Sequence, residues 1–216
     1  MRTFRMVRGG VAFTGLAAIS LWIAPGIPSQ EPKKPTYAEM VESAKRGDAG
    51  VDFAAMRYAF LESGGPYKNG FSNSRELNGL ARAKDYEKLL ARSNEFISMD
   101  FVDIRGHFFA GYALKALGRE GEAQKESALA KALVQSILDS GDGKTQKTAY
   151  VVINVAEEYA LMEWLGIQPN GQGLSAAGPN GPWYDADTGT RNGETITLYF
   201  DISKFYGKEF QKQPPH

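Results

Sequence analysis

The sequence contains no cysteine and only two histidines, of which His216 is the last residue. The absence of cysteine excludes disulfide bonds, thiol nucleophiles and cysteine-ligated metals, so the core alone must stabilise the fold. His107 is the only internal histidine, and any histidine-dependent proton transfer would have to use it. We therefore expect no cofactor and no transition-metal site, whereas a calcium or magnesium site made of carboxylates stays open.

Acidic side chains are absent from residues 1–29, which hold three arginines and an apolar run from Val11 to Ala24. The run is shorter than the roughly 20 residues that cross a bilayer, and a Pro-Gly pair ends it. This pattern is typical of a secretory signal peptide cleaved between Ala24 and Glu31, followed by a polar linker over residues 30–35. We expect an exported protein, periplasmic or extracellular, with no membrane contact after cleavage. An uncleaved N-terminal anchor is the competing interpretation.

The chain also lacks a surplus of basic residues. It has 25 basic and 25 acidic residues, and the predicted signal holds three of the basic ones, so its removal leaves a net charge of −3. A mildly acidic, exported chain does not fit a nucleic-acid-binding protein, and we expect no such partner.

Helical periodicity dominates residues 36–166 and is sharpest in a hairpin from Asp100 to Ser140, with Gly118 at its turn. Small residues fall where the two helices would touch, at the spacing of a 34-residue tetratricopeptide repeat: Gly111, Ala113, Ala123 and Ala130. The period recurs less distinctly before the hairpin. At the start, Thr36 and Glu39 have the spacing of a capping box. We predict a mainly α domain of tetratricopeptide-like helical hairpins over residues 36–166.

The segment from Thr145 to Gly166 has apolar residues on two sides of a helical pattern and is predicted to form one long helix. Residues 167–216 change to a period of two. TITLYFDIS alternates strictly, and Asn192-Gly193 suits a hairpin turn to the preceding GPWYDAD, with GQGLSAAG as a candidate third strand. We predict an α+β architecture in which a small C-terminal antiparallel β-sheet packs on the last helix.

Two glycine-rich segments are candidate binding regions. Residues 64–74 are predicted to form a solvated loop between repeats, and contact of its Tyr67 and Lys68 with a ligand is the functional alternative. The SGDGKT sequence at residues 140–145 lacks the glycine spacing of a phosphate-binding loop and the oxygen ligands of a calcium loop. It is predicted to be a turn, and its Asp142 is a candidate binding residue.

Three further polar residues are candidates. Glu157 and Glu158 are expected on a solvated polar strip, with recognition of a basic ligand as the functional alternative. As neighbours on a helix, they point about 100° apart and are poorly placed to act on one bond. His107 is expected to have a structural role and to pair with Asp103 one turn earlier.

Four short motifs carry a resemblance to a known family: Ser136-Ile137, Ser140-Gly141-Asp142-Gly143, Glu157-Glu158-Tyr159 and Tyr199-Phe200-Asp201. Through them, nearly all of the mature chain resembles short exported bacterial proteins catalogued only as a domain of unknown function. Many members of that family have a histidine near the position that is Glu126 in this chain. The resemblance implies export and a helical body, and it implies no activity.

These features favour a binding protein over an enzyme. Helical-repeat domains present a concave surface to peptides or partner proteins, and aromatic side chains anchor such contacts. We expect a protein or peptide partner and assign no catalytic residue. The candidate binding residues are Tyr67, His107, Asp142, Glu157 and Glu158. A carboxylate-dependent hydrolase is the alternative, and it requires Asp142, Glu157 and His107 to converge in one pocket.

Overall fold

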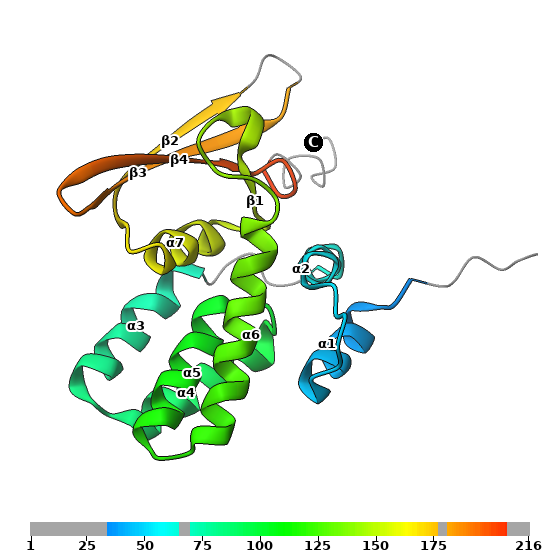
Figure 1. Ribbon diagram of the computed structural model, residues 1–216, viewed down its shortest axis with the longest axis vertical. Coiled ribbons are helices and arrows are strands. Elements are labelled where there is room, and N and C mark those ends of the chain that lie inside the picture. The colour runs from blue at the N-terminus through cyan, green and yellow to red at the C-terminus, as the bar shows by residue number, and fades with distance from the viewer. Residues whose placement is uncertain (1–33, 65–69, 177–180, 207–216) are drawn as a thin grey trace, which may run out of the picture. The chain divides into compact units, whose positions relative to one another are not determined.

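The computed structural model describes residues 34–64, 70–176 and 181–206 and gives side chains for all of these except 70–74. In this part of the chain, seven α-helices and a four-stranded sheet form a mixed fold (Figure 1). The predicted combination of a helical body with a small C-terminal sheet is confirmed. The predicted signal peptide and most of the linker lie outside the described residues. Within the described ranges, no helix combines the length and apolar character needed to cross a bilayer.

The first two helices both begin at side-chain caps, of which the sequence predicted only the first. Helix α1 (Tyr37–Arg46) opens with the predicted capping box, in which Glu39 N donates to Thr36 Oγ1 and Thr36 N donates to Glu39 Oε2. In α2 (Phe53–Glu62), Ala55 N donates to the side chain of Asp52 at 2.9 Å.

The next four helices pack in chain order, so that each of the last three contacts the helix before it. They are α3 (Gly70–Ala83), α4 (Tyr86–Met99), α5 (Ile104–Ala116) and α6 (Glu120–Leu138). The predicted hairpin corresponds to α5 and α6, and Gly118 in the turn between them has a φ of 75°. A Cβ on Gly111 would lie 2.8 Å from Ser127 Oγ, so a small residue is required where the two helices cross.

The loop predicted over residues 64–74 is wrong at its C-terminal end, because α3 begins at Gly70. Its glycine, serine and asparagine residues have low intrinsic helix propensity. Packing overrides that preference. Leu77 is fully buried in an apolar cluster with Leu89 and Phe109, so burial against α4 and α5 stabilises the helix.

The single long helix predicted from Thr145 to Gly166 is also wrong. This segment forms a short 3-10 helix (Gln146–Thr148), the strand β1 (Tyr150–Val151) and the helix α7 (Val155–Trp164). Asn154 separates strand from helix, since its side chain accepts a hydrogen bond from Glu157 N at 3.0 Å and caps α7. The β-branched residues before this cap suit the extended backbone that pairs with the C-terminal strand.

The sheet has the strand order β1-β4-β3-β2. The strands β2 (Gln168–Ala176), β3 (Trp183–Arg191) and β4 (Glu194–Asp201) form the predicted antiparallel meander. Asn192 and Gly193 have φ values of 55° and 82°, which fit a tight hairpin turn between β3 and β4. Strand β1 was not predicted, and it pairs with β4 in parallel.

The inner face of the sheet packs against α7, which runs alongside it in Figure 1. Phe200 and Ile202 belong to one apolar cluster with Met162 of α7, Ile137 of α6 and Met56 of α2. A second cluster holds α3, α4 and α5 together. The sheet thus contacts the last helix, and the described residues from Pro35 onward belong to one compact unit.

Candidate functional site

The five candidate binding residues do not share one site. Tyr67 lies outside the described residues. Asp142 is exposed on the loop after α6, whereas His107, Glu157 and Glu158 are buried. The prediction of a solvated strip for the two glutamates is wrong, because α7 packs against α3, α5 and strand β2 and both side chains are buried.

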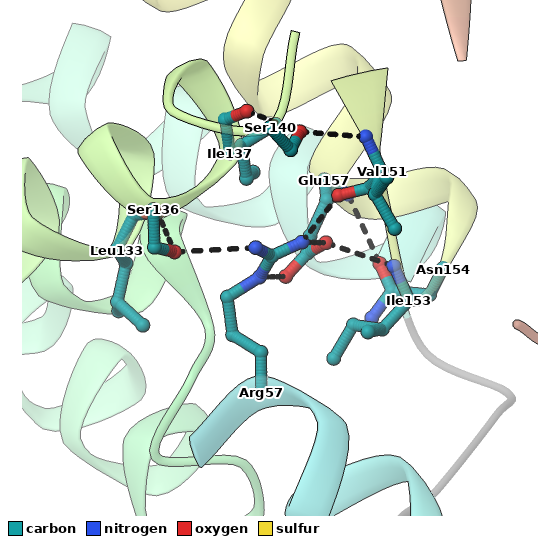
Figure 2. A network of polar contacts seen from close by, with 9 residues as sticks. All are labelled: Arg57, Leu133, Ser136, Ile137, Ser140, Val151, Ile153, Asn154 and Glu157. Atoms are coloured by element: carbon teal, nitrogen blue, oxygen red, sulfur yellow. Dashed lines mark hydrogen bonds and ion pairs between the residues drawn. The ribbon is translucent and has the colours of Figure 1, made fainter. Parts of the chain in front are cut away.

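Glu157 forms a buried ion pair with Arg57 of α2, shown in Figure 2. Arg57 Nε donates to Glu157 Oε1 at 2.7 Å, and Arg57 Nη2 donates to Oε2 at 2.6 Å. The guanidinium also donates to Ser136 Oγ and to the carbonyl oxygen of Val151, and Ile153 N donates to Glu157. Every group of this bidentate pair is satisfied, so it serves to join α2, α6, β1 and α7.

His107 is held in a second buried network. Its Nδ1 lies 2.6 Å from Glu126 Oε2, and its Nε2 lies 2.8 Å from the carbonyl oxygen of Phe101. The predicted pairing with Asp103 is wrong, because Asp103 caps α5 by accepting hydrogen bonds from the backbone of Arg105 and Gly106. Both ring nitrogens face oxygen acceptors, so the imidazole connects α5 and α6 and has no side open to a substrate.

Glu158 belongs to a third network that the sequence analysis missed, together with Asp185 and Asp187 of β3. Gln172 Nε2 donates to Asp185 Oδ2 at 2.8 Å and to Glu158 Oε2 at 3.4 Å. With both groups ionised, no hydrogen-bond donor among the described residues faces the carboxylate oxygens of Asp187 or Oε1 of Glu158. A proton on Glu158 would supply such a donor to Asp187.

Burial and repulsion between these carboxylates favour their protonated forms. Burial raises the pKa of Glu158 well above its ordinary value, and the charges of Asp187 and Asp185 add to this effect. Burial, followed by the charge of Asp185, raises the pKa of Asp187 to about 6, although a hydrogen bond to Glu158 opposes the shift. The pairing of β3 with β4 explains why these two aspartates are buried. Asp185 and Asp187 lie opposite Phe200 and Leu198, whose side chains are on the buried face of the sheet, so the alternation of side chains along the strands could have predicted their burial.

The geometry gives no support to the hydrolase alternative. Asp142, Glu157 and His107 each bond to a different set of partners, so the required convergence does not occur. In the described part of the chain, no group of three or more acidic, histidine or cysteine side chains could hold a metal ion. The carboxyl groups of Glu158, Asp185 and Asp187 are buried, and burial raises the pKa of each.

The surface between α3 and α5 has a groove with a volume of about 410 Å³. Phe108 and Tyr112 line it, and their side chains are 48% and 44% exposed. Arg82 and Lys84, at the C-terminal end of α3, line the same groove. The groove therefore combines two cations, neither of which forms an ion pair with a described residue, with exposed aromatic rings.

Comparison with known proteins identifies a family and nothing more specific. Searches of curated proteins and of solved structures found no match to the chain. A family described as a domain of unknown function (DUF4919) matches residues 56–211. That range includes helices α3 to α7 and the whole sheet, together with Arg57, His107 and the Glu158 cluster. The chain therefore belongs to the DUF4919 family.

Proposed function

We propose that the protein is a binding module whose groove between α3 and α5 takes a peptide segment of a partner protein. The observation that carries this proposal is the exposure of Phe108 and Tyr112 beside Arg82 and Lys84. Large exposed aromatic side chains in one hollow are typical of interaction surfaces, where they anchor a partner. The helices α3 to α6, as tetratricopeptide-like hairpins, would present this groove, and the predicted signal peptide would place it outside the cytoplasm.

The charges of the groove define the kind of peptide. Arg82 and Lys84 attract carboxylates, and the rings of Phe108 and Tyr112 accept an aliphatic or aromatic side chain. The fitting segment therefore carries an apolar residue next to aspartate or glutamate. Its affinity should fall with added salt, because the cations of the groove are exposed.

A random peptide-display library selected on the full chain tests this function. We expect enrichment of acidic segments with one large apolar residue, and enriched peptides are then measured by fluorescence polarisation. The double variant Phe108→Ala, Tyr112→Ala should weaken binding at least about tenfold, as loss of aromatic anchors does at other interfaces. Arg82→Glu should weaken it further at low salt.

Two matched control variants test whether the loss of binding is specific to the groove. Trp164→Ala removes another exposed aromatic side chain, and Lys131→Glu reverses a charge on α6, outside the groove. Both should bind the selected peptides as the unaltered chain does. Equal affinities in the groove variants and the unaltered chain would disprove the groove as the binding site.

A further inference from the structure

The loop between α6 and β1 forms a second surface hollow, separate from the groove. The hollow has a volume of about 530 Å³, within the range of small-molecule sites. The loop lines it with Lys144, Thr145, Gln146 and Lys147, and the sheet contributes Tyr184 and Tyr199. Its two formal charges are both positive, and its other polar groups include hydroxyl donors.

Asp142 holds this loop in one shape. Its Oδ1 accepts hydrogen bonds from Thr148 Oγ1 at 2.6 Å and from Lys144 N at 3.0 Å. These bonds, the first of them above all, lower the pKa of Asp142, so its carboxylate stays charged. The backbone nitrogens of Asp142 and Gly143 both donate to the carbonyl oxygen of Thr148. Asp142 therefore stabilises the conformation of the loop through hydrogen bonds to residues of the loop itself.

The sheet fixes the position of the loop. Tyr199 N donates to the carbonyl oxygen of Gly143 at 2.8 Å, and Gln146 Nε2 donates to Ser175 Oγ at 2.9 Å. Gly143 has a φ of 66°, and a Cβ there would lie 2.4 Å from the ring of Tyr150. Only glycine fits that contact. The hollow is thus built on a preformed loop, which lowers the entropy cost of binding.

The side chains of the two lysines contribute little to the stability of the loop. Lys147 makes no hydrogen bond or ion pair with a described residue, and Lys144 Nζ lies 3.6 Å from Asp142 Oδ2 with both side chains largely exposed. Such an exposed pair contributes little to stability. The loop is held in one conformation and places two lysine ammonium groups, which form at most a weak ion pair, next to two tyrosines. This combination is typical of an anion-binding site.

We propose that this hollow binds a small oxyanion ligand, bearing phosphate or carboxylate groups, through Lys144 and Lys147. Asp142 is a positioning residue that orients the loop and does not touch the ligand. The uncharged part of the ligand rests against Tyr199 and Tyr184. This site is independent of the peptide groove, since the two share no residue.

Isothermal titration of the full chain at low salt tests the site, with pyrophosphate and citrate as separate probes. We expect binding of at least one probe below about 10 mM, and a loss of at least about tenfold in the variant Lys144→Ala, Lys147→Ala. Binding of pyrophosphate alone assigns a phosphate ligand, and binding of citrate alone assigns a carboxylate ligand. No binding of either probe overturns the proposal.

Three further variants separate a built site from general charge attraction. Lys125→Ala, Lys131→Ala removes the same charge from α6 and should leave binding unchanged; an equal loss there overturns the proposal. Lys144→Arg, Lys147→Arg should retain binding. Asp142→Asn should weaken it and shift the backbone amide resonances of the loop, as a positioning role requires. The double alanine variant should keep its affinity for groove peptides, so either site can fail without the other.

Discussion

At the residue scale, buried carboxyl groups determine how the protein responds to pH. Glu158 and Asp187 face each other between α7 and the sheet, and Asp100 accepts a hydrogen bond from Val102 N at the end of α4. Burial, with the charge of Asp103 second, raises the pKa of Asp100 to about 8. Each of these groups holds a proton more tightly in the folded chain than in the unfolded one.

We therefore expect stability to fall as the pH rises. A carboxyl group with a raised pKa stabilises the fold fully only below its ordinary value near 4, and this contribution is lost as the pH rises through the folded value. The relevant window runs from about pH 4, through the pKa of about 6 for Asp187, to that of about 8 for Asp100. Urea unfolding at a series of pH values measures it.

Isosteric variants show which carboxyl group causes each part of the dependence of stability on pH. Asp100→Asn should flatten the upper part of the profile, and Asp187→Asn should flatten the part around pH 6. Glu76 is a suitable control, because it is exposed and Arg92 lowers its pKa. Glu76→Gln should leave the slope between pH 6 and 8 unchanged. A stability that is constant or increases across this window would contradict the prediction.

At the element scale, α7 and β4 depend on each other. Strand β4 places Leu198 and Phe200 on the face that packs against α7, while Thr197 points to the exposed face. The two-residue period of TITLYFDIS predicted this division, because successive side chains of a strand alternate between faces. Strand β1 also depends on β4, because among the described strands it pairs only with β4. The sequence pattern did not predict this pairing.

Phe200→Asp should therefore destabilise the helices as well as the sheet. The substitution removes a fully buried ring and places a charge in the core, which should cost about 4 kcal/mol or more. Thermal melting followed by the helical circular dichroism signal measures the effect. Thr197→Asp makes the same charge change on the exposed face and should alter stability by less than about 0.5 kcal/mol. Equal melting temperatures for both variants would show that α7 and the sheet unfold independently.

At the scale of the whole molecule, the pair of Arg57 and Glu157 joins segments 100 residues apart in sequence. Arg57 is completely buried, and its guanidinium contacts α6, the backbone of β1 and α7. Removing one partner leaves the other charge buried without compensation, which typically costs more than replacing both. The pair thus makes the folding of the N-terminal helices depend on that of the C-terminal part.

A double-mutant cycle measures this dependence. Arg57→Met should lower the free energy of unfolding by about 3–5 kcal/mol, and Arg57→Met, Glu157→Met should recover part of the loss. Arg92→Met breaks a surface pair with Glu76 and should cost less than about 1 kcal/mol. Urea unfolding followed by both tryptophan fluorescence and circular dichroism provides the values. If Arg57→Met costs no more than Arg92→Met, the buried pair does not couple the two parts.

Prediction from sequence succeeded where the determining interactions are local. The capping box of Thr36 and Glu39, the turn at Gly118 and the hairpin at Asn192-Gly193 each depend on residues within a few positions of one another. The alternation along β4 likewise depends only on strand geometry. The candidate site was harder to predict, because Arg82 and Phe108 come together only when α3 packs on α5.

The sequence by itself determined the helical body, the C-terminal meander and the turns between them, because caps, glycines and periodicity act over short distances. Only the tertiary structure decided that α3 is a helix, that residues 145–166 divide into a 3-10 helix, a strand and a helix, and that Glu157 and Glu158 are buried. The physical reason is that burial free energy comes from partners distant in sequence. Leu77 packing on α4 and α5, β4 pairing with β1, and Arg57 pairing with Glu157 each outweigh a local preference.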